Sequence, residues 1–288
     1  MPNPPALSDR LRRFLPERWR KTRPRVAVLR LQGAIGAISP LRPGLSIGAL
    51  APSLERAFSL PQLSGVALIV NSPGGSAAQS HLIYRRIRTL AAEKGVPVFA
   101  FVEDAAASGG YMIACAADEI FADPASLVGS IGVVSAGFGF QELIARIGVE
   151  RRVHTQGEAK AMLDPFRPED PADVARLLDI QADVQALFTG LVTERRKKLD
   201  PGQNLFTGAV WSGRQALELG LVDGLGDVRT VLRERFGEKV AFKMIAEQKG
   251  SLVARLLRRN APGSTASALP EATIAALEER AAWARFGL

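Results

Sequence analysis

Residues 105–118, AAASGGYMIACAAD, hold the side chain best placed for nucleophilic chemistry. Ser108 lies between an apolar strand pattern and an apolar helical run, directly before Gly109 and Gly110. Glycines let backbone segments approach closely and leave their N–H groups accessible. A serine at the mouth of a helix can present its hydroxyl beside such N–H groups, as an acyl-transfer nucleophile at an oxyanion site requires. The alternative is that Ser108 only caps the helix, because serine is a favoured N-cap residue.

A second informative stretch is NSPGG at residues 71–75. It follows the continuous apolar run 66–71, which predicts a strand buried on both faces. Two glycines then bare their N–H groups before a helix begins, which would suit half of an oxyanion hole. A tight turn would use the same residues for purely steric reasons, so this stretch alone leaves both interpretations open.

The composition bounds the class of protein. The chain has 288 residues, of which 47% are hydrophobic, as in a globular protein with a sizeable core. Its single cysteine, Cys115, excludes an internal disulfide and is expected to pack in the core. With only two histidines, His81 and His154, a Ser-His-Asp triad has few candidate bases. We find no zinc spacing and no pattern of basic and aromatic residues typical of nucleic-acid binding.

The positive charge is concentrated at one end of the chain. Residues 1–25 carry six of the eight net positive charges. Residues 7–15 place four apolar side chains at helical spacing with arginines opposite, which suits an amphipathic helix on a membrane surface. Packing of this helix on its own domain or on a neighbouring subunit is the alternative. No apolar run reaches the length of a transmembrane helix, and no signal peptide is recognisable. We therefore expect a protein that is cytoplasmic, or peripheral to the inner membrane through residues 7–19.

The order of elements predicts an α/β protein, because strand and helix patterns alternate. We expect domains at residues 1–24 (a basic amphipathic arm), 25–246 (the catalytic domain) and 247–288 (a C-terminal helical extension). The expected strands span residues 25–31, 66–71, 97–102, 119–122, 127–134, 148–153 and 239–245. The expected helices span residues 46–59, 76–94, 111–117, 141–147, 171–199, 212–219, 227–236 and 271–285.

The motifs together carry a resemblance. In order, they are NSPGG, ASGGYMIACAAD, VGSIGV, GEAKAMLDPFRP and WSGRQALELGLVDGLG. This series resembles the signal peptide peptidase family, the serine proteases of the SppA and SohB type (peptidase family S49), over roughly residues 25–235. The resemblance implies a ClpP/crotonase-like fold, a spiral of β-β-α units.

The same resemblance implies a set of roles. Ser108 would be the nucleophile and Lys160, within GEAKAMLDPF, its base. Ser130 of VGSIGV would position the lysine, and the N–H groups of Gly75 and Gly109 would bind the oxyanion. No metal or cofactor is implied. A free lysine is almost wholly protonated at pH 7, so a lysine base needs an apolar surround that disfavours its charge. Residues 159–163, AKAML, could supply one.

We therefore expect an ATP-independent serine endopeptidase that hydrolyses short hydrophobic peptides, signal-peptide remnants or membrane-protein fragments. The resemblance also implies assembly into a homo-oligomeric ring. Two alternatives stay open: a crotonase-like acyl-CoA enzyme on the same fold, and a catalytically dead, membrane-associated scaffold. The presence of both Ser108 and Lys160 argues against each of them.

Overall fold

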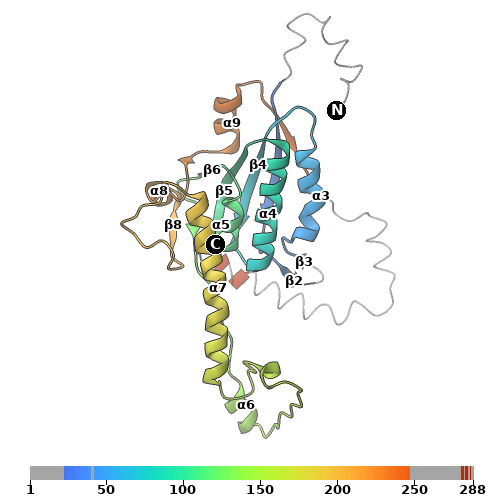
Figure 1. Cartoon of the computed structure of the whole chain (residues 1–288), viewed down its shortest axis with the longest axis vertical. Helices are drawn as coiled ribbons and strands as arrows, with labels where there is room; N and C mark the ends of the chain where they lie inside the picture. Colours follow the sequence, from blue (N-terminus) through green and yellow to red (C-terminus); the bar gives the residue numbers. More distant parts are fainter. Residues whose placement is uncertain (1–22, 40–41, 247–279, 282, 285, 287–288) are drawn as a thin grey trace, which may run out of the picture.

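A mostly parallel β-sheet forms the centre of the molecule (Figure 1). The structure is a computed structural model that describes residues 23–39, 42–246, 280–281, 283–284 and 286. The main path of the sheet has the strand order β10-β1-β4-β5-β6-β9. These strands are β1 (Arg25–Gln32), β4 (Leu63–Ser72), β5 (Val98–Ala107), β6 (Glu119–Ala122), β9 (Gly224–Leu225) and β10 (Ala241–Met244). The α/β class predicted from the sequence is confirmed.

Both faces of the sheet are buried, as the continuous apolar runs of the central strands predict. Side chains alternate between faces along a strand. Along β4, Leu68 and Val70 belong to a large apolar cluster, whereas Ala67 and Ile69 belong to a second one. The large cluster includes buried residues of the helices α3 (Ile47–Phe58), α4 (Ala77–Lys94) and α5 (Gly109–Ala114). The second cluster includes Leu232 of the helix α9 (Val228–Phe236).

The helices α3 and α4 begin where the sequence places capping residues. Ser46 and Ser76 are their N-caps, and each side chain accepts a hydrogen bond from the backbone N–H three residues later. The helix α4 ends at Gly95, which has φ 62° in the left-handed region that glycine tolerates. The bounds of both helices therefore agree with the prediction to within one residue.

The strand β5 is longer than predicted, and its last residues pair with a different strand. Residues 105–107 leave β6 and pair in parallel with β7 (Leu127–Gly129). In turn, β7 pairs antiparallel with β8 (Val210–Ser212), which leads into the short helix α8 (Gly213–Glu218). The nucleophile candidate therefore follows a strand that is held on both sides, by β4 and by β7.

A projecting arm departs from this body. We use the name for residues 133–180, which include α6 (Gln141–Arg146), the 3-10 turn Glu158–Ala161 and the first part of α7 (Pro171–Arg195). Figure 1 shows α7 running out of the body with α6 at its far end. Only the last third of α7 is buried, at Phe188, Leu191 and Val192.

Two arginines fix the C-terminal end of α7 to the body of the protein. The Arg195 side chain donates to the backbone oxygens of Cys115 and Ala117, at 3.1 and 2.9 Å. The buried Arg196 forms an ion pair with Asp223 at 2.7 Å. These contacts hold the C-terminal end of α7 beside the residues that follow α5, the helix that begins after Ser108.

Some expectations are corrected. The strand expected at 148–153 does not form, because these residues lie on the exposed arm with no neighbouring strand to pair with. The strand expected at 127–134 ends at Gly129, because Ser130 turns the chain with φ 52°. The short strands β2 (Ala37–Ser39) and β3 (Arg42–Pro43), absent from the prediction, form a small separate sheet.

Most of the predictions for the two termini concern residues that the structure does not describe. Most of the basic arm, 1–24, and residues 247–279 of the C-terminal extension lie outside the described residues. Of the helix expected at 271–285, the described positions 280–281 and 283–284 are helical. Among all the described residues, no helix is both long and apolar enough to cross a membrane.

Candidate active site

The backbone at Ser108 is held in an unusual conformation. With φ 51° and ψ −122°, it lies where non-glycine residues are rare and strained. Its N–H donates to the oxygen of Gly129 at 2.8 Å, and its own oxygen accepts from Met112 at 3.0 Å. The side chain makes no capping hydrogen bond, unlike those of Ser46 and Ser76. Ser108 occupies the N-cap position of α5, but its side chain does not cap the helix, so its hydroxyl is available for chemistry.

Two backbone donors lie beside it. The N–H groups of Gly75 and Gly109 find no acceptor among the residues that the structure describes. The groups around them are engaged: the Gly74 N–H donates to Ser72 Oγ at 3.2 Å, and the Ser76 N–H to Ile35 O at 2.8 Å. Both free donors belong to residues that line one pocket with Ser108. They have the chemistry that stabilises an oxyanion.

The glycines of NSPGG are required by geometry. A methyl group on Gly74, where φ is 101°, would lie 2.7 Å from Ser108 Cβ. A methyl group on Gly75, where φ is 137°, would lie 2.2 Å from Ile35 O. Both distances are far shorter than any real carbon contact, so the turn approaches the nucleophile only because it lacks side chains. The steric and functional interpretations of this stretch therefore apply together.

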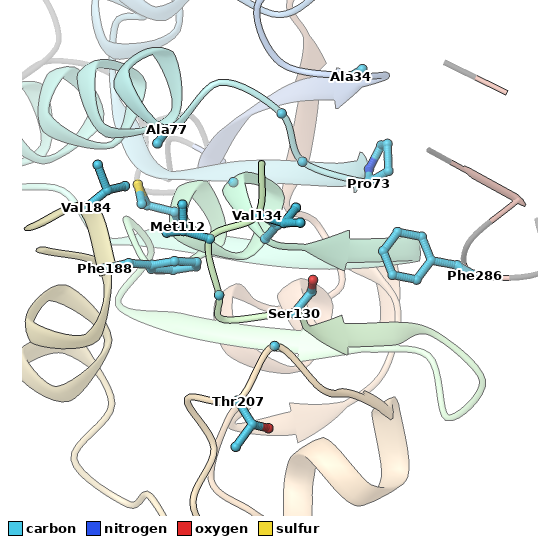
Figure 2. Close-up of a pocket in the computed structure, with 17 residues that line it drawn as sticks. Ala34, Pro73, Ala77, Met112, Ser130, Val134, Val184, Phe188, Thr207 and Phe286 are labelled. Atoms are coloured by element: carbon cyan, nitrogen blue, oxygen red, sulfur yellow. The ribbon is translucent and has the colours of Figure 1, made fainter. Parts of the chain in front are cut away.

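Ser130 reaches the same pocket from the other side. It follows β7, and its N–H donates to Ala209 O at 2.7 Å, while Gly208 N–H donates to Ile131 O at 3.1 Å. These bonds continue the pairing of β7 with β8 by another two residues. Figure 2 shows the Ser130 hydroxyl directed into the pocket. No hydrogen bond to this hydroxyl is found among the described residues.

The pocket itself has a volume of about 590 Å³, within the range of small-ligand and peptide side-chain sites. In Figure 2, Met112, Val184 and Phe188 gather at one end, with Pro73 and Phe286 at the other. Sequence reasoning missed Val184 and Phe188, which α7 brings to the site. No local signal marks them, because they look like any apolar residues of a long helix.

Lys160 is not brought to this pocket. It lies in the 3-10 turn on the projecting arm, its side chain is exposed, and it does not line the pocket. Within the described residues, no hydrogen bond or ion pair joins its Nζ to another group. The neighbouring acid Asp164 is engaged elsewhere, in an ion pair with Arg151 at 2.9 Å. The structure thus gathers Ser108, Gly75, Gly109 and Ser130 but leaves Lys160 apart.

The other nucleophile and base candidates fit no catalytic role. Cys115 is fully buried, and burial raises the pKa of its thiol to about 12, as expected for core packing. His81 lies on α4 stacked on Tyr84, and burial, followed by the charge of Arg85, lowers its pKa. His154 is exposed on the arm. No cluster of three or more potential metal ligands occurs in the described part of the chain.

The comparison with known families decides the classification. The sequence profile of peptidase family S49 matches residues 91–240, more than half of the chain. The chain belongs to peptidase family S49. The family predicted from the sequence motifs is thereby confirmed, and the matched region contains Ser108, Ser130 and Lys160.

Curated proteins similar to this chain include two proteases and one protein that bears another name. A putative protease of Synechocystis is 31% identical over 71% of this S49 chain and 71% of its own length. The chloroplastic serine protease SPPA of Arabidopsis thaliana is 33% identical over 71% of the chain and 31% of its own. A Brucella abortus protein named Na(+)/H(+) antiporter NhaA is 50% identical over 98% of the chain but 40% of its own length. The chain thus spans less than half of the last two relatives.

Solved structures with a related arrangement include two variants of the membrane-bound stomatin-specific protease 1510-N. One aligns over 78% of the S49 chain with a TM-score of 0.46 and 15% identity. The other, in complex with a substrate peptide, aligns over 83% with a TM-score of 0.48 and 14% identity.

Proposed function

We propose that this chain is a serine endopeptidase in which Ser108 attacks the scissile carbonyl of a peptide. The observation that carries the proposal is the state of Ser108. It is held in a strained strand-to-helix junction, its hydroxyl does not cap the helix, and its pocket holds two N–H groups that have no acceptor in the described part of the chain. A purely structural serine would have no need of strain or of free donors beside it.

The reaction follows from these groups. Ser108 Oγ bonds to the carbonyl carbon and gives its proton to the base, while the carbonyl oxygen becomes an oxyanion held by the N–H groups of Gly75 and Gly109. The carbon–nitrogen bond then breaks, and the base returns the proton to the leaving amine. Water then attacks the acyl-enzyme and gives a proton to the same base, which returns that proton to Ser108 Oγ as the acid leaves.

Lys160 is the proposed base, delivered by a second copy of the chain. One copy leaves Lys160 exposed on the projecting arm, away from the Ser108 pocket. The arm also exposes large apolar side chains, including Phe138, Leu143 and Ile147, at 79, 54 and 64% of their surface. Apolar surface of this kind marks an interaction site. Assembly of copies into a ring would cover this surface and bring each Lys160 to a neighbour's Ser108.

Ser130 is the proposed positioning residue for that lysine. Its hydroxyl faces the pocket and makes no hydrogen bond within the described residues, so it is free to accept one from an incoming ammonium or amine. A neutral hydroxyl orients the lysine without adding a charge that would favour its protonated form.

Peptides with apolar side chains are the proposed substrates. The pocket is walled by Met112, Val184 and Phe188 at one end, and none of its lining residues is acidic or basic. Burial of an apolar side chain there is favourable, whereas a charged one would lose its hydration without a partner. Short hydrophobic peptides, signal-peptide remnants and membrane-protein fragments have this character.

The residues that line the pocket also weaken the acyl-CoA alternative. Hydratases and isomerases on this fold would need a carboxylate beside the paired N–H groups, and the pocket lining contains none. The scaffold alternative is weakened by the strained Ser108, since nothing would maintain the strain without catalysis.

The proposal is tested by assaying the purified chain on a fluorogenic peptide with an apolar residue before the scissile bond. We expect cleavage without ATP, and covalent labelling by a fluorophosphonate, which reacts with an activated serine. A peptide with aspartate at the same position is the matched control and should be cleaved much more slowly. Absence of both cleavage and labelling in the assembled protein would remove the peptidase proposal.

We also propose that residues 7–19 hold the protein at an anionic membrane surface. Leu7, Leu11, Phe14 and Leu15 recur at helical spacing among arginines, and each basic residue near such a surface contributes about 1 kcal/mol. A cytoplasmic protein peripheral to the inner membrane would result.

We expect sedimentation with anionic vesicles at low salt and release at high salt, because the basic residues act through screened charge. Deletion of residues 1–24 should abolish binding and leave peptide cleavage intact. Neutral vesicles are the control. Sedimentation that persists after the deletion would place the membrane contact elsewhere.

A further inference from the structure

We infer that Ile35 is a positioning residue that sets the separation between the two oxyanion donors, an inference that rests on the proposed function. Ile35 does not line the pocket, and only 4% of its surface is exposed. It nevertheless lies against both Gly75 and Gly109, whose N–H groups find no acceptor within the residues that the structure describes. Ile35, in the loop between β1 and β2, also belongs to the large apolar cluster of the core.

The backbone of Ile35 holds the first donor. Its N–H donates to Gly74 O, and its oxygen accepts from Ser76 N–H, both at 2.8 Å. These two bonds bracket Gly75 in a parallel bridge. The fit is so close that a methyl group on Gly75 would lie 2.2 Å from Ile35 O. The direction of the Gly75 N–H is therefore fixed by the backbone of Ile35.

The side chain of Ile35 meets the second donor. A methyl group on Gly109 would lie 3.3 Å from Ile35 Cδ1 and 2.2 Å from Ser80 Oγ. Ser80 is itself fully buried and bonded to Ser76 O at 2.8 Å. Gly109 thus lies beside Ile35 Cδ1 and Ser80 Oγ, so the Ile35 side chain packs between the segment that holds Gly75 and the start of α5.

The segment around Ile35 is rigid enough to transmit this constraint. On its other side, Leu45 N–H donates to Ala34 O at 2.9 Å, and Gly36 N–H donates to Leu45 O at 2.8 Å. Ile35 is therefore clamped between Leu45 and Gly74. Oxyanion donors act only within a narrow range of distances. A small shift of Gly109 relative to Gly75 therefore reduces the stabilisation of the transition state more than it reduces substrate binding.

The test is Ile35→Val, which deletes Cδ1 and leaves the backbone bonds in place. We expect kcat to fall about tenfold with KM nearly unchanged, a part of the loss that follows removal of a whole donor. A peptide aldehyde is the second readout. Ser108 Oγ adds to its carbonyl carbon, and the former carbonyl oxygen occupies the oxyanion position, so its inhibition constant should rise by the same factor. The matching peptide alcohol, which has no carbonyl, should bind as before.

Ile69→Val is the matched control, because it deletes the same methyl group from the apolar cluster on the other face of the sheet. We expect a similar small loss of thermal stability but wild-type kcat. Ile35→Leu, which keeps δ-methyl groups, should recover most of the activity. If Ile35→Val behaves like Ile69→Val, with unchanged kcat and aldehyde affinity, Ile35 is only a core residue. Activity that survives Ser108→Ala would instead refute the peptidase proposal itself.

Discussion

Ser108→Ala is expected to abolish peptide cleavage and fluorophosphonate labelling while leaving the fold intact. Loss of the nucleophile of a serine protease costs at least about 10⁴-fold in kcat. The substitution removes one oxygen atom that makes no hydrogen bond as a cap, so the thermal midpoint should not fall. Cleavage rate, labelling on a gel and thermal unfolding of the same preparation measure all three quantities.

Ser46→Ala is the matched control for this variant. Ser46 also stands at a helix N-terminus, but its Oγ accepts a hydrogen bond from Ala49 N–H at 3.4 Å. Its loss should cost about 1 kcal/mol of stability and no activity. The two variants should thus behave in opposite ways. Ser108→Ala should lose activity and keep its stability, whereas Ser46→Ala should keep activity and lose stability. A Ser108→Ala protein with normal activity would contradict the assignment of the nucleophile.

Lys160→Ala is expected to lower kcat by at least about 10²-fold, the smaller loss for a positioned general base. The variant removes the only base that we propose for both proton transfers. Steady-state kinetics of the variant and the wild type on the same peptide measure the loss.

The separation of Lys160 from the pocket makes a sharper experiment possible. Neither Ser108→Ala nor Lys160→Ala should be active alone, but subunits of the two mixed during assembly should regain activity. If each site combines a serine from one copy with a lysine from its neighbour, about a quarter of the sites in an equal mixture are complete. Two inactive variants that stay inactive after verified subunit exchange would show that the arm reaches its own Ser108 instead.

Three further substitutions test the assignment of Lys160 as the base. His81→Ala and His154→Ala should retain activity, because the proposed mechanism gives neither histidine a proton transfer. Ser130→Ala should lower kcat more than it raises KM, by less than the loss at Ser108. An essential His154 with a dispensable Lys160 would replace the dyad by a histidine mechanism.

Much of the fold could be predicted because its signals are local. The continuous apolar run of β4 indicated burial on both faces, and Ser46, Ser76 and Gly95 marked helix ends through short-range hydrogen bonds and backbone freedom. The strand expected at 148–153 failed for a physical reason. A strand needs a hydrogen-bonding neighbour, and the sequence of one segment does not say whether the fold supplies one.

The sequence by itself determined the nucleophile candidate and its glycines, because a serine at a strand-to-helix junction and a Pro-Gly-Gly turn are patterns of adjacent residues. Only the tertiary structure decided that Ser108 caps nothing, that α7 brings Phe188 to the pocket, and that Ile35 touches both donor glycines. Only the tertiary structure also separated Lys160 from Ser108. These relations join residues far apart in the chain, and packing between elements, rather than periodicity within one, sets such distances.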